Sequence, residues 1–177
     1  MPAFAALKAT AALAAAMGLL SVAPQTVVAG KAGTMEVVGT SGISAQMMFL
    51  GAASTVYMLD KAENNPAQVN GHPAWATAYN INSNTFRTMN INSNTFCAGG
   101  AMLGDGRVLA TGGNQAVGSG GDAVKDGTGP YKDYDGGRVL RTLKPGSGAN
   151  WVELSTQLDK ERWYPTVEPL KDGYVII

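Results

Sequence analysis

Hydrophobic positions beyond residue 45 come in short runs that are bounded by glycine-containing turns. The runs lie at 47–50, 56–59, 75–80, 108–111, 139–143, 151–154 and 174–177, and Asn-Gly, Asp-Gly, Gly-Gly and Pro-Gly pairs stand between or beside them. Short apolar runs between turn residues are typical of β-strands. Long helical patterns are scarce outside the first twenty residues. The pattern therefore predicts an all-β chain, and strands at this spacing favour a sandwich, barrel or propeller.

A longer repeat narrows this choice. Residues 95–108 align without a gap with residues 162–175, an offset of 67, and both copies contain Leu-x-Asp-Gly-x-Val. Between them lies a Gly- and Asp-rich stretch, Gln115–Asp135, which we interpret as a long loop. Without that loop the repeat approaches the ~50 residues of a kelch blade, so we expect a kelch-type propeller.

The repeat places Cys97 and Tyr164 at equivalent positions in successive blades. Equivalent residues of a propeller lie at the same height and radius around its axis. If both lie near the central channel, their side chains could meet. A shorter echo, Ile81–Phe86 followed by Ile91–Phe96, predicts a strand, a turn and a strand.

The amino terminus is typical of a secretory signal. Lys8 precedes a mostly apolar run, Ala9–Leu20, and small residues end at Ala29. That run is shorter than the ~20 residues of a membrane span. We expect residues 1–29 to be a signal peptide and residues 30–177 to be a secreted, extracellular partial propeller, enough for about three blades.

Composition excludes some partners and makes one side chain conspicuous. Lys and Arg number 13, as do Asp and Glu, so the chain offers no basic surface for nucleic acid or an anionic membrane. Cys97 is the only cysteine, which rules out an intrachain disulfide. A lone thiol outside the cell is expected to be buried, paired with another chain or consumed by other chemistry.

Several longer motifs carry a resemblance to a known family. They are Asn70-Gly-His-Pro-Ala-Trp75, Asn94-Thr-Phe-Cys-Ala-Gly-Gly100, Gly112-Gly-Asn-Gln-Ala-Val117, Asp133-Tyr-Asp-Gly136 and Arg162-Trp-Tyr-Pro-Thr166. In this order the chain resembles the glyoxal oxidase branch of the copper radical oxidases. The resemblance implies a seven-bladed propeller with one copper ion at its axis. It also implies a thioether between Cys97 and Tyr164, with Tyr164 as a copper ligand and radical site.

The implied reaction is RCHO + O2 + H2O giving a carboxylic acid and hydrogen peroxide, with small aldehydes and 2-hydroxycarbonyl compounds as substrates. Aldehyde oxidation removes two electrons, whereas copper cycles by one, so the tyrosine supplies the second oxidising equivalent. The family's remaining ligands, a Tyr-His pair and a further His, fall in later blades. This chain has one histidine, so we expect a fragment that is inactive alone.

Plainer interpretations stay open for each residue. Cys97 is also consistent with an inert packing thiol, and Tyr164 with a core aromatic whose hydroxyl meets a carbonyl. We expect Trp163 to pack in the core and His72 to serve a turn. As a whole, the alternative to an oxidase is a secreted kelch propeller without copper that binds carbohydrate or protein. A galactose oxidase-like alcohol oxidase is the near neighbour, and the sequence does not define the oligomeric state.

Overall fold

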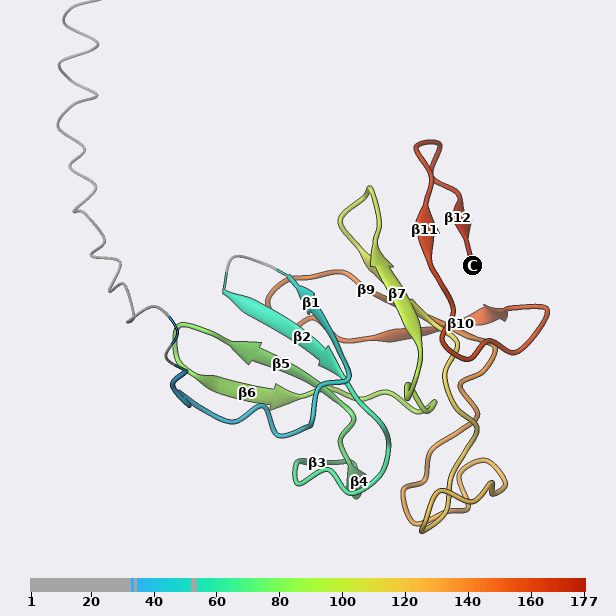
Figure 1. The fold of residues 1–177 in the computed structure, drawn as a ribbon, viewed down its shortest axis with the longest axis horizontal. Coiled ribbons are helices and arrows are strands. Elements are labelled where there is room, and N and C mark those ends of the chain that lie inside the picture. Colours follow the sequence, from blue (N-terminus) through green and yellow to red (C-terminus); the bar gives the residue numbers. More distant parts are fainter. Residues whose placement is uncertain (1–32, 34, 52–53) are drawn as a thin grey trace, which may run out of the picture. The chain divides into compact units, whose positions relative to one another are not determined.

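The computed structural model describes residues 33, 35–51 and 54–177 (Figure 1). The predicted signal peptide, residues 1–29, lies outside the described residues. Residues Val38–Ile177 form one compact unit. Every regular element described in it is a β-strand, which confirms the all-β prediction for this part of the chain. Within the described residues, no helix has the length and apolar character required to cross a membrane.

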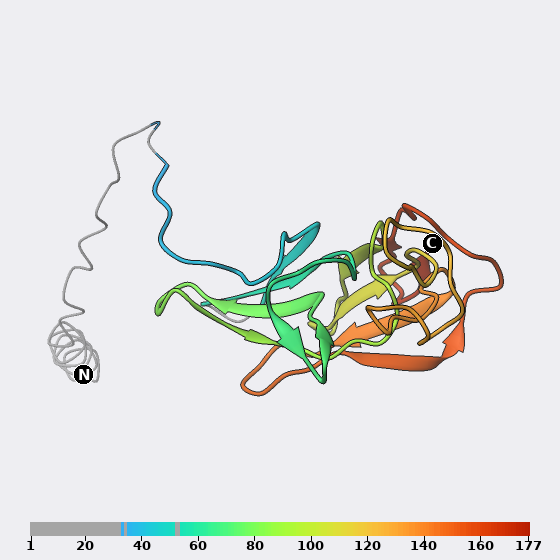
Figure 2. The same ribbon diagram turned by 90° about the horizontal axis from the view of Figure 1, so that it is seen from below.

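Two four-stranded sheets form the framework, and each is an antiparallel meander. The first has the order β1 (Met47–Leu50), β2 (Thr55–Leu59), β5 (Ala76–Asn80) and β6 (Thr85–Thr88). The second consists of β7 (Gly99–Met102), β8 (Val108–Thr111), β9 (Val139–Leu143) and β10 (Val152–Gln157). The sheets are separate groups of arrows in Figure 2, cyan to green and yellow-green to orange. Two short hairpins complete the elements: β3 (Gln68–Val69) with β4 (His72–Pro73), and β11 (Glu168–Pro169) with β12 (Val175–Ile176).

The core between the two sheets depends on small residues in β7. The Phe49 ring of β1 meets the Trp151 ring edge-on, with centroids 6.3 Å apart. A Cβ on Gly100 would lie 2.8 Å from the Phe49 ring, and a Cβ on Gly99 would lie 2.0 Å from the Pro165 carbonyl oxygen. The strand β7 therefore lies against both neighbours, and its glycines leave the space that this contact requires. A run without β-branched residues gives little strand signal, so the sequence did not predict β7.

The predicted 67-residue repeat recurs in the backbone hydrogen bonds. In the β7–β8 turn the amide of Leu103 donates to the Arg107 carbonyl oxygen at 2.7 Å. In the β11–β12 turn the amide of Leu170 donates to the Tyr174 carbonyl oxygen at 2.8 Å. The amide of Gly51 makes the corresponding bond in the β1–β2 turn, 52 residues before Leu103. The three hairpins are thus equivalent, and β11 lies against β7 (Figure 1).

The described residues hold two complete four-stranded sheets and one further hairpin, against the expectation of about three blades. The difference arises because residues 60–75 and 112–138 mostly form connections. No closed ring occurs among the described residues. The predicted strands at 47–50, 108–111 and 139–143 have the observed bounds.

The short echo is not a pair of strands, and that prediction was wrong. At the first copy, the preceding residue Asn80 caps the β5–β6 turn, because its side-chain oxygen accepts from the amides of Asn82 and Ser83 at 2.9 and 3.2 Å. Asn84 ends the turn with φ 53°. The second copy, 91–96, contains only the isolated bridge of Ser93. Its Asn and Ser side chains are used for tertiary contacts instead of a turn.

Candidate functional site

The segment from Asn92 to Cys97, which we call the connecting segment, leads from the first sheet into β7. Ser93, Asn94, Thr95 and Cys97 are all buried in it. On the side of the first sheet, the indole nitrogen of Trp75 donates to the Ser93 carbonyl oxygen at 3.0 Å. These contacts hold the backbone that leads to Cys97.

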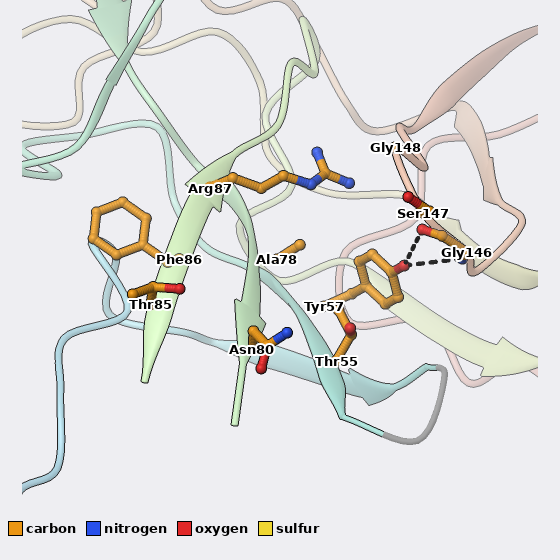
Figure 3. A pocket seen from close by; sticks show the side chains of 10 residues that line it. All are labelled: Thr55, Tyr57, Ala78, Asn80, Thr85, Phe86, Arg87, Gly146, Ser147 and Gly148. Atoms are coloured by element: carbon orange, nitrogen blue, oxygen red, sulfur yellow. Dashed lines mark hydrogen bonds between the residues drawn. The ribbon is translucent and has the colours of Figure 1, made fainter. Parts of the chain in front are cut away.

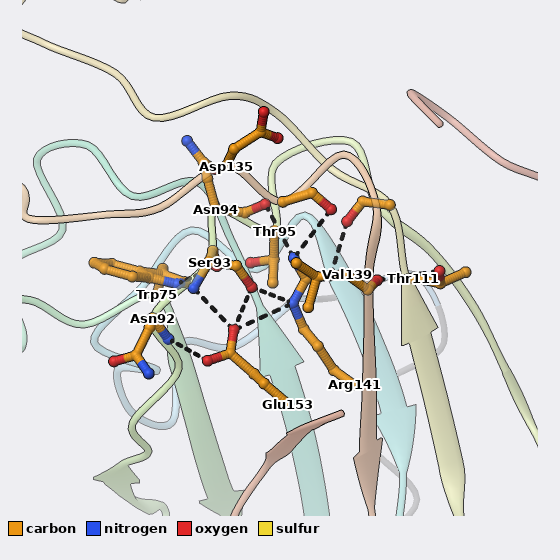
Figure 4. Close-up of polar contacts among 12 residues, drawn as sticks. Trp75, Asn92, Ser93, Asn94, Thr95, Thr111, Asp135, Val139, Arg141 and Glu153 are labelled. Atoms are coloured by element: carbon orange, nitrogen blue, oxygen red, sulfur yellow. Dashed lines mark hydrogen bonds and ion pairs between the residues drawn. The ribbon is translucent and has the colours of Figure 1, made fainter. Parts of the chain in front are cut away.

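Arg141 of β9 holds the same segment from the second sheet (Figure 4). Its fully buried guanidinium donates to Ser93 Oγ and to the Gly112 carbonyl oxygen, each at 2.7 Å, and to the Asn94 carbonyl oxygen at 3.4 Å. Glu153 Oε1 lies 3.8 Å from Arg141 Nε and accepts from the Ser93 amide at 2.9 Å. Burial lowers the pKa of Arg141 to about 10, against the opposing effect of Glu153, so the guanidinium stays charged at neutral pH.

Asn94 joins the connecting segment to the long loop. Its side-chain nitrogen donates to Asp133 Oδ2 at 2.9 Å and to the Gln115 carbonyl oxygen at 3.1 Å. Asp133 also accepts from the Val117 amide at 3.2 Å. Burial raises the pKa of Asp133, although these hydrogen bonds oppose the shift. This carboxylate is therefore a structural acceptor that orders the loop.

Cys97 lies at the junction of three strand systems. Its side chain is completely buried, and its backbone has φ 60°. The Cys97 amide donates to Gln46 Oε1, at the entry to β1, at 3.1 Å. Its carbonyl oxygen accepts from the Tyr164 amide, before β11, at 2.8 Å. The structure thus brings together the two residues that the repeat makes equivalent.

Tyr164 is 62% exposed, whereas Cys97, whose carbonyl oxygen it contacts, is buried. A side-chain hydrogen bond with Cys97 is the main reason that the pKa of Tyr164 is raised. The Trp163 ring meets the Tyr164 ring edge-on, with centroids 4.9 Å apart. Trp163 is itself 64% exposed, so the prediction that it packs in the core was wrong. It belongs to the loop before β11 and not to a strand that faces the shared core.

Both residues adopt the left-handed backbone conformation, and so does a third equivalent residue. The φ angles are 62° at Ala45, 60° at Cys97 and 54° at Tyr164. This conformation costs an L-residue about 1–2 kcal/mol, so its recurrence at three non-glycine positions needs a common cause. Each residue precedes the first strand of its unit by a few positions. The same bend thus recurs at each entry, and two of the three bends carry Cys97 and Tyr164.

A groove of about 430 Å³ lies beside this pair, and we call it the Trp163 groove. It is lined by Gly113, Asn114, Gln115, Asp135, Gly137, Glu161, Arg162 and Trp163. Two backbone hydrogen bonds fix its walls: the Gly113 amide donates to the Arg162 carbonyl oxygen at 3.0 Å, and the Arg162 amide to the Gly137 carbonyl oxygen at 2.8 Å.

A second cavity, of about 330 Å³, lies at the other end of the sheets (Figure 3). There the Tyr57 hydroxyl meets the Gly146 amide nitrogen and carbonyl oxygen at 3.2 and 3.3 Å. Gly146 follows β9 at the end of the second sheet opposite Gly99 and Cys97. This cavity is therefore remote from the Cys97–Tyr164 pair.

The residues described here do not fit a complete copper site. Copper(II) is suited by imidazole and phenolate ligands, and this pair supplies one phenol and one thiol. The only histidine of the sequence, His72, is buried in β4. Its Nδ1 lies 2.7 Å from the Pro73 carbonyl oxygen, and its ring is tilted against the Trp75 ring, with centroids 4.6 Å apart. Among the described residues, no group of three His, Cys, Asp or Glu side chains is placed to hold a metal ion.

Comparison with known proteins gives one distant relationship. The chain is 28% identical over 167 residues to aldehyde oxidase GLOX of Vitis pseudoreticulata, an alignment that covers 82% of this chain. The aligned part spans 28% of the length of that oxidase. No family model matches the chain, and no solved structure matches it. The relationship is thus to an aldehyde oxidase, at an identity too low to show family membership.

Proposed function

We propose that this chain is part of an extracellular copper radical oxidase that converts small aldehydes to carboxylic acids and reduces O2 to hydrogen peroxide. The observation that carries the proposal is the contact of Cys97 with Tyr164, through the hydrogen bond that the Tyr164 amide donates to the Cys97 carbonyl oxygen. The distant relationship to an aldehyde oxidase supports it.

The pair is suited to form a covalent cofactor. Joining the Cys97 sulfur to a ring carbon next to the Tyr164 hydroxyl removes one hydrogen from each side chain, and O2 accepts these two electrons and two protons as hydrogen peroxide. A thioether at this position makes the phenol easier to oxidise. Buried Cys97 is protected from other oxidants, whereas exposed Tyr164 stays open to a substrate.

The overall reaction balances as RCHO + H2O + O2 giving RCOOH + H2O2. The hydrated aldehyde loses two electrons and two protons, and O2 takes both. Copper, held in part by Tyr164, would supply one-electron redox chemistry. Because the described residues do not complete its coordination, further ligands would have to come from residues outside this sequence.

The same proposal includes a kelch-type seven-bladed propeller for the full-length protein. Two meanders of the same topology, followed by a third equivalent hairpin, are the pattern that radial repetition produces. The competing function is a secreted propeller without copper that binds carbohydrate or protein, and the presence of both Cys97 and Tyr164 favours the oxidase over it.

The test is to sequence the transcript beyond the codon for Ile177 and to assay its copper-loaded product for aldehyde-dependent hydrogen peroxide. We expect an open reading frame with a Tyr-His pair and a later His, and activity that the Tyr164→Phe variant loses. A stop codon directly after Ile177, or a copper-loaded product without aldehyde-dependent peroxide, would contradict the oxidase.

A further inference from the structure

The Cys97 backbone occupies a conformation that its surroundings must impose. Cys97 is the third residue of a turn that the Ala98 amide closes on the Thr95 carbonyl oxygen at 3.0 Å, and its φ is 60°. A turn with a positive φ at this position normally takes Gly or Asn. Other residues stay there only where neighbouring contacts fix them. The conformation of Cys97 therefore depends on the groups that bind its amide and its carbonyl oxygen.

Those two groups come from the units on either side of Cys97. Its carbonyl oxygen accepts from the Tyr164 amide at 2.8 Å, and its amide donates to Gln46 Oε1 at 3.1 Å. Gln46 lies directly before β1 and follows Ala45, the residue equivalent to Cys97 in the first unit. The backbone of Cys97 is thus held by one hydrogen bond from each neighbouring unit.

The two junctions use different kinds of acceptor. The Tyr164 amide binds a backbone carbonyl oxygen, which any residue at position 97 would supply. The Cys97 amide binds a side chain, so this contact needs a residue at position 46 that carries an oxygen acceptor at the length of glutamine. Cys97 is completely buried, and a buried amide without an acceptor is destabilising. The conformation of Cys97 is therefore specified by the identity of residue 46.

This conformation matters because it sets the direction of the thiol. The φ and ψ angles of Cys97 restrict the rotamers that its side chain can adopt. Coupling requires Cys97 Sγ to approach a ring carbon next to the Tyr164 hydroxyl, and a reaction between two held groups slows steeply when one is misplaced. An amide released from Gln46 would let the turn relax and move the thiol out of this approach.

We propose that Gln46 is a positioning residue, which holds Cys97 in the left-handed conformation from which its sulfur couples to the Tyr164 ring. In that step the S–H bond and one ring C–H bond break, the S–C bond forms, and O2 takes up the two electrons and two protons as hydrogen peroxide. The coupling rests on the proposed function, whereas the restraint on the Cys97 amide rests on the hydrogen bond alone.

Hydrogen exchange of the Cys97 amide in the copper-free, full-length gene product tests the restraint. Gln46→Leu removes the acceptor, so this amide should exchange at least about tenfold faster than in the parent. Gln46→Glu keeps an oxygen at the same length and should stay within about threefold of the parent. Gln157→Leu, at the exposed end of β10, is the matched control and should leave the exchange unchanged. Gln46 is also exposed, so these variants should keep the urea midpoint of the parent.

The rate of thioether formation tests the positioning role. After copper loading without air, exposure to O2 starts the coupling, and the joined peptides 88–107 and 163–171 are followed by mass spectrometry. Gln46→Leu should form them at least about tenfold more slowly, and Gln46→Glu should restore the rate. The inference is overturned if Gln46→Leu matches the parent in either measurement, or if Gln46→Glu is as slow as Gln46→Leu. A parent that forms no thioether would contradict the proposed function, and the exchange rates would still decide whether Gln46 restrains Cys97.

Discussion

Arg141 offers the most direct test of how the Cys97 segment is held. Replacement of Arg141 by methionine keeps an unbranched apolar side chain but removes every donor. It leaves the Gly112 carbonyl oxygen and Ser93 Oγ without the donors that lie 2.7 Å away, and Glu153 without its positively charged partner. Removing one partner from a buried ion pair costs about 3–5 kcal/mol. The Glu153 side chain keeps 22% of its surface exposed, so water recovers part of this loss. We therefore expect Arg141→Met to lower the free energy of unfolding by about 3 kcal/mol, the lower end of that range. The total stability of a domain is about 5–15 kcal/mol.

Urea unfolding followed by tryptophan fluorescence measures this change. With a slope of about 1–3 kcal/mol per molar urea, the midpoint should fall by about 1–3 M. Arg138→Met is the matched control, since Arg138 lies three positions earlier, is exposed, and donates only to the Leu158 carbonyl oxygen. It should cost less than about 1 kcal/mol.

A double-mutant cycle separates the ion pair from the other contacts. Glu153→Gln keeps an acceptor for the Ser93 amide but removes the charge, so combining it with Arg141→Met should cost less than the two single changes added together. The expected coupling is about 0.5–3 kcal/mol. If Arg141→Met costs under about 1 kcal/mol, or if the two changes simply add, the charged network does not hold the connecting segment.

Three further changes test the packing, the reactive pair and the long loop. Gly100→Ala should destabilise the protein by about 1–3 kcal/mol, because its Cβ would lie 2.8 Å from the facing phenylalanine ring. Gly104→Ala, with no atom within 4 Å of its Cβ, should change stability by no more than about 0.5 kcal/mol in urea unfolding; equal effects would contradict the packing. Cys97→Ala removes the side-chain hydrogen bond that raises the pKa of Tyr164, so an NMR titration of ring-labelled tyrosine should show that pKa falling towards its ordinary value of about 10. An unchanged pKa would mean that the two side chains are not in contact. The pKa of Asp133 is raised in the folded state, so its stabilising contribution is present below the ordinary pKa and is lost as pH rises through the folded value. Asp133→Asn should therefore gain stability relative to the parent as the pH rises above the ordinary pKa of an aspartate, and a pH-independent difference would refute the shift.

Strands with strong apolar character were predictable from the sequence. The runs 108–111 and 139–143 end at turn residues and form central strands, β8 and β9, with the predicted bounds. Strand β7 was not predicted, because strand propensity depends on local sequence and glycine has little of it. Gly99 and Gly100 are required here by tertiary contacts, since a Cβ would collide with Pro165 at Gly99 and with Phe49 at Gly100. The echo at 91–96 misled for a similar reason, since its Asn and Ser side chains bind Asp133 and Glu153 instead of closing a turn.

The candidate pair was predictable to a limited degree. The repeat made Cys97 and Tyr164 equivalent, and the structure adds the backbone hydrogen bond that joins them. The role of Gln46 could not be predicted from a local sequence pattern, because its side-chain oxygen accepts from the amide of Cys97, 51 residues later. The Trp163 groove could not be predicted either, since its walls come from three loops that only the fold brings together.

The most direct measurement of the central claim is peptide mass spectrometry of the natural, copper-loaded gene product after trypsin digestion. Cleavage at Arg and Lys places Cys97 in the peptide 88–107 and Tyr164 in the peptide 163–171. The account predicts one joined species whose mass is two hydrogens below the sum of the two peptides, and which is absent from a Cys97→Ser variant. Two separate peptides, with an alkylatable thiol at Cys97, would contradict it.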